Sequence, residues 1–384
     1  MSAATNRDCR KPVFFVLLLA ALALTAGLAT RGVAAETAVR INQAQVIGTH
    51  NSYHRQADEA MLKLIERFEP KVRPTLEYSH RPLPEQFSRL GIRQVELDIF
   101  ADPKGGRYAK PRGPKMAAVL GLPTGGPYDP EGLMRRPGFK VMHVQDIDFR
   151  STVPTFVAGL RQIRDWSAAH PRHFPIFILV ELKDDTPSPL LTKALPFGPK
   201  ELDAIDAEIL SVFQREEILT PDDVRGSFAS LPGALAKRGW PTLAAARGKV
   251  LFGMDNEGRP RDLYLKGHPA LQGRLLFVSV PETNPAAAWM KVNDPVGDFD
   301  RIQLLVRRGF LVRTRADADT KQSRENDPRQ RDRALASGAQ FVSTDYPEPN
   351  PAFSPYCVRF PGGIVVRRNP VNGDPKLNGV DLEK

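Results

Sequence analysis

Cysteine is nearly absent from this chain of 384 residues, which contains only Cys9 and Cys357. A fold of this size must therefore depend on a large apolar core and not on a disulfide framework. Long hydrophobic runs are equally scarce. Only residues 13–28 form one, and the mean hydropathy of −0.32 excludes a polytopic membrane protein. With 41% hydrophobic residues, the chain does not have the composition of a disordered or fibrous protein either.

The one apolar run has the features of a secretory signal. It follows Arg7, Arg10 and Lys11 and precedes Val33-Ala34-Ala35, whose small residues suit a signal peptidase. We expect residues 1–35 to be cleaved and the protein to be secreted or periplasmic. An uncleaved anchor is the alternative, although the run is shorter than the about 20 residues that span a bilayer. Cleavage lowers the formal charge from +10 to +7, because residues 1–35 hold four cations and one carboxylate, and it leaves a single thiol.

Eight short runs rich in β-branched residues recur along the chain, separated by helix-like or Gly/Pro-rich sequence. Strands that alternate with helices indicate parallel pairing with crossovers. Eight of them favour an α/β fold of the (β/α)8 TIM-barrel type in a single domain. A doubly wound open sheet is the alternative. The predicted strands are residues 45–51, 94–100, 140–144, 176–183, 249–254, 274–280, 310–315 and 340–345.

Amphipathic patterns predict helices over residues 57–68, 153–169, 201–213, 295–308 and 329–337. Residues 102–139 interrupt the alternation after the second strand, because 15 of these 38 positions are Gly or Pro. A long loop at the carboxyl end of a barrel strand lies over the active-site mouth. This loop could serve as a lid, contact a membrane or have no role beyond connecting two elements, and the sequence does not decide among these. We place the barrel core at about residues 41–346 and a tail on the barrel exterior at residues 347–384.

Several predicted strands carry polar residues near their carboxyl ends. The first ends in His50 and Asn51, and the second places Glu96 and Asp98 on one face. The fourth places Glu181 and Lys183 on one face in the same way.

Three carboxylates pointing into a barrel repel one another unless a cation lies among them. The available ligands are hard oxygens with no cysteine, which favours Ca²⁺ first and Mg²⁺ or Mn²⁺ second. In the alternative interpretation, the carboxylates pair with Lys183, Arg93 or Arg313 in a structural network.

Two histidines, His50 and His143, stand at the ends of the first and third predicted strands. Phosphodiester cleavage needs one group that takes a proton from the attacking hydroxyl and another that protonates the leaving oxygen. A lone histidine at a strand end is more often a core residue, but a pair beside three carboxylates favours catalysis. No role is assigned to the histidines in predicted loops or helices, which are His54, His80, His170, His173 and His268.

Four blocks resemble the catalytic domain of phosphatidylinositol-specific phospholipase C. They are Thr-His50-Asn51-Ser-Tyr, Leu-Gly-Ile-Arg-Gln-Val-Glu96-Leu-Asp98, Lys-Val-Met-His143 with the Asp-Phe pair at 148–149, and Phe-Pro-Ile-Phe-Ile-Leu-Val-Glu181. Two later segments are similar to the secreted bacterial calcium-dependent branch of that family. They are Arg-Thr-Arg-Ala-Asp at 313–317 and Ser-Gly-Ala-Gln-Phe-Val-Ser-Thr-Asp-Tyr-Pro at 337–347.

The resemblance implies that Asn51, Glu96, Asp98 and Glu181 bind Ca²⁺ while His50 and His143 act on the phosphodiester. The inositol 2-hydroxyl would attack phosphorus, which releases diacylglycerol and leaves a cyclic inositol phosphate that water can open. The resemblance makes His143 the acid for the diacylglycerol oxygen and leaves His50 and Glu96 as alternatives for the base. Calcium-independent bacterial relatives have an arginine at the metal position, so the carboxylates argue against that variant.

The fifth predicted strand departs from the animal enzymes of this family, which carry lysines there that bind ring phosphates. In Lys249-Val-Leu-Phe-Gly-Met-Asp255 no lysine follows Lys249 within the strand, which favours unphosphorylated phosphatidylinositol at a membrane surface as the substrate. We expect Lys183 and Arg313 to contact its phosphate or inositol. A charge of +7 is too small to indicate nucleic acid, and no obligate protein partner is evident.

Two other functions compete with this one. A glycerophosphodiester phosphodiesterase is also a metal-dependent barrel, and Glu181-Leu-Lys183 resembles its Glu-x-Lys strand, but its usual opening is His-Arg-Gly and here Asn51 follows His50. The second competitor is a secreted barrel that binds phospholipid headgroups without turnover. It would be expected to lack a histidine or a metal ligand, and none is missing.

Overall fold

The computed structural model describes residues 39–384 except 124, 125 and 127. The predicted signal, residues 1–35, lies outside this part of the chain. Within the described residues, no helix has the length and apolar character that crossing a membrane requires.

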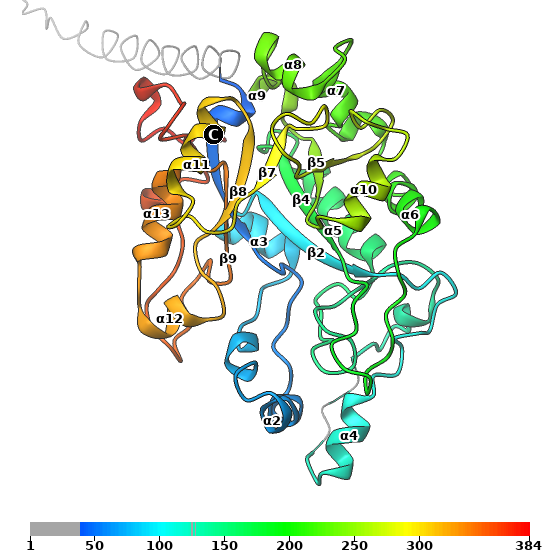
Figure 1. Cartoon of the computed structure of the whole chain (residues 1–384). Helices are drawn as coiled ribbons and strands as arrows, with labels where there is room; N and C mark the ends of the chain where they lie inside the picture. Colours follow the sequence, from blue (N-terminus) through cyan, green and yellow to red (C-terminus); the bar gives the residue numbers. More distant parts are fainter. Residues whose placement is uncertain (1–38, 124–125, 127) are drawn as a thin grey trace, which may run out of the picture.

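Eight parallel strands form a nearly closed barrel (Figure 1). They are β1 (Ala44–Thr49), β2 (Gln94–Phe100), β4 (Ile176–Leu182), β5 (Val250–Met254), β6 (Leu276–Val278), β7 (Trp289–Lys291), β8 (Leu311–Arg315) and β9 (Phe341–Thr344). The hydrogen-bonded order is β6-β5-β4-β2-β1-β9-β8-β7, and an isolated parallel bridge between Ser279 and Trp289 joins the two outer strands. This confirms the predicted TIM-type barrel against the open-sheet alternative.

One predicted barrel strand was wrong and another was missed. Residues 140–144 supply only β3 (Lys140–Val141), which pairs antiparallel with the end of β2 and is not part of the barrel. The chain reverses direction at Asp146, which has a φ of 71°. The residues on either side of this turn, Val144 and Asp148, form an antiparallel bridge. The vacant barrel position belongs to β7, three residues whose shortness hid them from a pattern search.

Helices cover the outside of the barrel. All five predicted helices are present, one with the predicted bounds and four with shifted ends. The longer helices are α2 (Glu59–Phe68), α3 (Leu83–Leu90), α5 (Phe156–Ala169), α6 (Pro199–Leu210), α8 (Leu231–Lys237), α10 (Arg259–Leu265), α11 (Phe299–Arg307) and α13 (Arg329–Ser337). Shorter ones are α7 (Pro221–Arg225), α9 (Leu243–Ala246) and α12 (Lys321–Glu325). Side-chain caps explain two of the starts, because Asp58 and Thr155 accept the Met61 and Ala158 backbone N–H groups.

The barrel interior changes from apolar at its amino end to charged at its carboxyl end. Residues two apart share a face, so β4 points Phe177 inward near its start and Glu181 near its end. Phe177 stacks on Phe341 of β9 with ring centroids 4.5 Å apart and contacts Trp289 of β7 at 5.4 Å. A Cβ on Gly253 would lie 2.5 Å from the Phe177 ring, so this packing needs glycine there. An aromatic plug thus fills the amino end and leaves the carboxyl end polar.

The described part of residues 102–139 has more regular structure than its composition suggests. They contain α4 (Gly113–Val119) and a 3-10 turn, η3 (Leu133–Arg135), and α4 packs beside α2 at the lower end of Figure 1. A second hydrophobic cluster holds this region together, and it includes Met61, Tyr108, Ala117 and Met134. Because α2 and α4 follow the carboxyl ends of β1 and β2, this substructure borders the barrel mouth.

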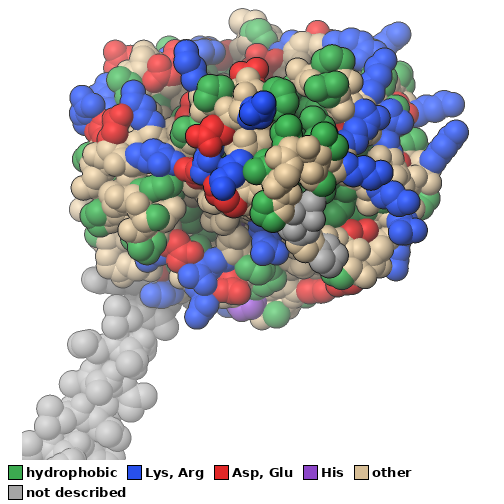
Figure 2. Space-filling model, turned by 90° about the horizontal axis from the view of Figure 1, so that it is seen from below, with side chains coloured by type: hydrophobic (Ala, Val, Ile, Leu, Met, Phe, Trp, Pro, Cys, Tyr) green, Lys and Arg blue, Asp and Glu red, His purple; other side chains and the backbone are tan. Residues whose placement is uncertain are grey.

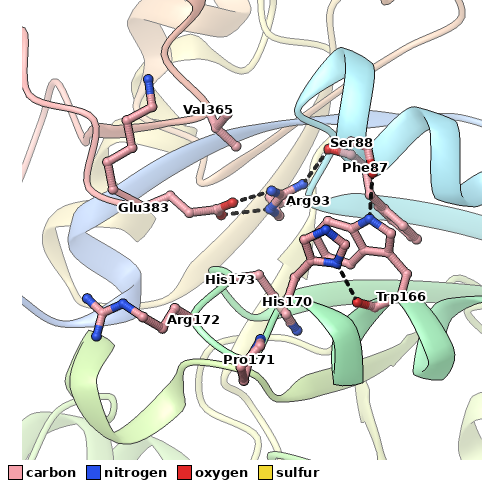
Figure 3. A pocket seen from close by; sticks show the side chains of 11 residues that line it. Phe87, Ser88, Arg93, Trp166, His170, Pro171, Arg172, His173, Val365 and Glu383 are labelled. Carbon is pink, nitrogen blue, oxygen red and sulfur yellow. Dashed lines mark hydrogen bonds and ion pairs between the residues drawn. The ribbon is translucent and has the colours of Figure 1, made fainter.

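The tail returns to the opposite end of the barrel. Its strand β10 (Val366–Arg368) pairs antiparallel with the first half of β1. Glu383 forms an ion pair with Arg93, a buried side chain beside a cavity of about 510 Å³ that Trp166 and His170 also line (Figure 3). Arg93 therefore serves the amino end of the barrel, far along the strand from Asp98.

Candidate active site

His50 follows β1 and is held by a carboxylate from β9's end. Its Nδ1 lies 2.8 Å from Asp345 Oδ1, and Arg315 of β8 donates to the other Asp345 oxygen at 3.2 Å. Burial, reinforced by the Arg315 charge, lowers the pKa of His50 to about 3. Burial opposes ionisation of Asp345, but His50 and Arg315 hold its pKa well below the usual range. The neutral ring thus donates through Nδ1 and keeps the Nε2 lone pair free, 3.7 Å from Glu96 Oε1.

The three predicted carboxylates gather at the barrel mouth. Ligand oxygens of Glu96, Asp98 and Glu181 all lie within 4.8 Å of one another. Burial raises the pKa of Glu96 to about 8, and burial with the Glu181 charge raises the pKa of Asp98 well above its usual range. Among the described residues, neither Asp98 oxygen has a hydrogen-bond partner. A buried carboxylate with two unpartnered oxygens, crowded by two other carboxylates, has the chemistry of a cation site.

Two basic residues lie beside these carboxylates, as the structural-network interpretation predicted. Lys183 Nζ is 3.2 Å from Glu181 Oε1 and 3.4 Å from Asp98 Oδ2, and Arg313 donates to Glu96 Oε2 at 2.6 Å. The third cation of that interpretation, Arg93, does not participate. Since both Asp98 oxygens still lack a hydrogen-bonded donor, these cations leave room for a metal in the same cluster.

Asn51 lies two residues after β1 in a backbone conformation that asparagine tolerates better than most residues. Its φ is 44°, and its carbonyl accepts the His54 N–H at 2.8 Å, so the chain turns sharply there. Its Nδ2 donates to the Tyr78 hydroxyl at 3.0 Å, while the buried Oδ1 has no partner among the described residues. A fixed amide with an unpartnered oxygen fits the expected calcium ligand. The donor set of Asn51 and three carboxylates therefore suits Ca²⁺.

His143 is held by a second carboxylate that it shares with His54. Its Nδ1 lies 2.8 Å from Asp148 Oδ2, and His54 Nε2 lies 2.9 Å from the same oxygen. The other ring nitrogen of His54 bonds the Tyr78 carbonyl at 3.0 Å. Because that carbonyl and an ionised carboxylate can only accept, both His54 nitrogens must carry protons. Burial opposes this charge, but Asp148 outweighs it and raises the pKa of His54, while the two histidines hold the pKa of Asp148 well below its usual range.

Every predicted site residue therefore lies in this region. Tyr78 links its two halves, because Asn51 bonds the Tyr78 hydroxyl and His54, beside His143, bonds the Tyr78 carbonyl. The sequence interpretation missed the residues that position the histidines: Asp345, Arg315, Asp148 and the fully buried His54. It also missed His80, which donates through Nε2 to the His50 carbonyl at 2.8 Å. The only signal for His54 was its place four residues after His50, within the turn that ends the first strand.

A barrel whose mouth combines crowded carboxylates with carboxylate-held histidines defines the class of TIM-like barrel phosphodiesterases. Residues 39–370 match the family described as "Phosphoinositide phospholipase C, Ca2+-dependent", and the chain belongs to it. The protein is therefore a phosphodiesterase of a Ca²⁺-dependent family whose substrate is phosphatidylinositol.

Two solved structures illustrate the similarity. The calcium-dependent phosphoinositol-specific phospholipase C of a Pseudomonas species is 17% identical, with 87% of this chain and 96% of that chain covered and a TM-score of 0.50. The Ca²⁺-dependent phosphatidylinositol-specific phospholipase C of Streptomyces antibioticus is 17% identical, with 81% and 96% covered and a TM-score of 0.49. A comparison with curated proteins found no match.

Proposed function

We propose that this protein cleaves phosphatidylinositol by attack of the inositol 2-hydroxyl on phosphorus, with His50 and His143 as its proton-transfer groups. The observation that carries the proposal is that each histidine is oriented through Nδ1 by its own buried carboxylate, Asp345 or Asp148. Each ring thus presents Nε2 for catalysis, the arrangement that general acid–base chemistry requires.

His50 takes the part of the base. Its neutral Nε2 accepts the proton of the 2-hydroxyl as the oxygen forms its bond to phosphorus. Asp345 then stabilises the imidazolium that results, as a buried carboxylate does for a catalytic histidine. Glu96, the alternative base, is already bonded to Arg313 and lies in the carboxylate cluster, which favours its role as a ligand.

His143 takes the part of the acid. As the bond from phosphorus to the glycerol oxygen breaks, its Nε2 gives a proton to that oxygen, and diacylglycerol leaves with a cyclic inositol phosphate as the second product. The buried Arg313 and the half-buried Lys183 lie among the carboxylates and supply positive charge near the phosphate position. The absence of lysine between residues 250 and 254 supports an unphosphorylated inositol ring.

Asn51, Glu96, Asp98 and Glu181 would hold Ca²⁺ in this reaction. When bound, the ion supplies Lewis-acid stabilisation of charge on the phosphate and the hydroxyl oxygens. The protein's own contribution is to hold the three carboxylates close together and to leave Asn51 Oδ1 and both Asp98 oxygens without a hydrogen-bond partner among the described residues.

The test measures diacylglycerol and water-soluble inositol phosphate released from labelled phosphatidylinositol, with Ca²⁺ and with EGTA. His50→Ala and His143→Ala should each lose about 10²- to 10⁴-fold in rate. The matched control is His268→Ala, because His268 bonds only its own loop through the Gln272 carbonyl. Turnover of glycerophosphoinositol alone would instead identify a glycerophosphodiester phosphodiesterase. Headgroup binding without any turnover would identify a binding protein.

A further inference from the structure

An apolar groove opens beside the candidate active site. It encloses about 570 Å³ between α2, the turn η2 (Arg73–Leu76), α4 and residues 187–191. Its apolar lining comes mainly from Leu64, Ile65, Phe68, Met116, Leu190 and Leu191. The volume falls within the about 300 to 1,000 Å³ of small-molecule sites in proteins.

Several large apolar side chains at the rim of this groove are exposed to solvent. Nine large hydrophobic side chains are exposed in the described part of the chain, and five lie on or next to α2, α4 and residues 187–191: Phe68, Val72, Val119, Leu120 and Leu190. Phe68 and Leu190 are each 58% exposed. Figure 2, which looks onto this end, shows hydrophobic side chains next to a group of acidic and basic ones. Exposed apolar side chains that cluster in this way indicate a site for an apolar ligand or surface, whereas singly scattered ones do not.

The groove is continuous with the catalytic cluster through one side chain. His143 lines the groove with its neighbour Val144, and the same ring is bonded to Asp148. In the proposed reaction His143 protonates the glycerol oxygen, so the glycerol and its acyl chains depart on this side of phosphorus. The apolar lining therefore begins at the position where the apolar part of the substrate must lie.

The outer wall of the groove is fixed before any ligand binds. Arg112, just before α4, donates to the Leu190 carbonyl at 3.1 Å, and Arg107 donates to the Lys193 carbonyl at 2.7 Å. Asp146 accepts from the Thr192 backbone and hydroxyl. These bonds hold residues 187–193 against the α4 substructure, and a preformed groove spares a ligand the ordering cost.

We propose that this groove binds the glycerol end and the first methylenes of the acyl chains of a diacylglycerophospholipid, and of the diacylglycerol released from it. The inference rests on the proposed function, since it assigns the leaving-group side of that same site. The proposal predicts that the protein prefers substrates with acyl chains even when no membrane is present. Each buried methylene would raise affinity about fourfold.

The test uses soluble substrates below their micellar concentration, so that a membrane cannot contribute. The Phe68→Ser/Leu190→Ser double variant is compared with Leu210→Ser/Leu304→Ser, whose side chains are 48% and 49% exposed on α6 and α11. The substrates are dihexanoyl phosphatidylinositol and an inositol phosphate methyl ester without acyl chains. We expect kcat/KM for the dihexanoyl lipid to fall about tenfold or more in the groove variant alone, and the methyl ester to react equally in all three proteins.

Equal loss on both substrates, or no loss on either, would overturn the proposal. A loss confined to phosphatidylinositol vesicles would overturn it as well, because the side chains would then only touch a membrane. Binding of dioctanoylglycerol to the metal-free protein, measured by calorimetry, separates this inference from the reaction. Binding that weakens in the groove variant supports the groove even if phosphatidylinositol is never cleaved, and absence of binding to the wild type refutes it.

Discussion

At the scale of single residues, the site depends on carboxylates that determine which nitrogen of each histidine carries a proton. In Asp345→Asn the amide can donate to His50 Nδ1, which favours the tautomer with its proton on Nε2 and removes the base. We expect kcat to fall about 10²- to 10⁴-fold with little change in KM. Steady-state kinetics on phosphatidylinositol would measure this, with the exposed Asp300→Asn as control. Unchanged kcat would show that Asp345 does not position the base.

The shared Asp148 makes a prediction about stability. Folding raises the pKa of His54, so its ion pair stabilises fully below the ordinary value of 6.5 and is lost as pH rises through the raised value. Folding depresses the pKa of Asp148, so that contribution is present above 3.8 and is lost only as pH falls through the depressed value. The pair therefore stabilises most between about pH 4 and 6.5.

Asp148→Asn should accordingly lower the free energy of unfolding by about 3 to 5 kcal/mol at pH 6, because His54 keeps a buried charge without its anion. The loss should be smaller at pH 9. Urea denaturation at both pH values measures the difference, and Asp203→Asn, which breaks an exposed pair with Arg274, should cost less than about 1 kcal/mol. A loss that is the same at pH 6 and pH 9 would contradict a charged His54.

Sequence reasoning reached some of these residues and not others for a physical reason. Glu96, Asp98 and Glu181 interrupt apolar strands, so their inward position follows from the two-residue period. Asp148 and His54 meet from two loops, and nothing in a one-dimensional pattern reports that encounter. Their pairing depends on the turn at Asn51 and on the bridge between Val144 and Asp148.

At the scale of elements, periodicity predicted the long strands and amphipathic helices but not the short pieces. β7 has only three residues and ends in Lys291, whose charge is accounted for by an ion pair with Asp255. β3 has the composition of a barrel strand, yet it pairs antiparallel because the chain before it has already turned back along β2. The positions of strands can thus be predicted from the sequence, whereas the direction of each strand depends on the path of the loops.

The segment before and within α4 carries its charge with one sign. Residues 103–123 contain five Lys or Arg and no Asp or Glu, and Lys110 and Lys115 are exposed beside the rim of apolar side chains. A basic juxtamembrane lysine contributes about 1 kcal/mol to binding of an anionic surface. Lys110→Gln/Lys115→Gln should therefore weaken binding to phosphatidylinositol vesicles about 10- to 30-fold, with the effect vanishing at high salt.

Vesicle sedimentation measures this effect, and Lys237→Gln/Lys266→Gln is the matched control because these exposed lysines lie at the ends of α8 and α10 on the barrel exterior. Activity on a soluble short-chain lipid should be unchanged in both variants. If the control pair weakened vesicle binding as much as the α4 pair, total charge and not this element would attract the membrane.

At the scale of the whole molecule, the barrel separates its two ends by chemistry. Aromatic packing around Phe177 and the bonds of the tail to Arg93 stabilise the amino end, while the carboxyl end keeps buried like charges. Such charges weaken the folded state when no cation lies among them. We expect Ca²⁺, on which the family depends, to relieve this electrostatic cost when it binds at the carboxyl end.

A ligand that binds only the folded chain stabilises it by mass action, so Ca²⁺ should raise the melting temperature of the whole barrel. At Ca²⁺ a hundredfold above its Kd the gain is about 2.7 kcal/mol, or about 3 to 5 °C for a chain of this length. Asp98→Asn should abolish that rise because it removes the ligand whose two oxygens have no other hydrogen-bond partner among the described residues. Asp203→Asn should preserve it. Differential scanning calorimetry with and without EGTA decides the matter, since a full rise in Asp98→Asn would place the calcium outside the barrel mouth.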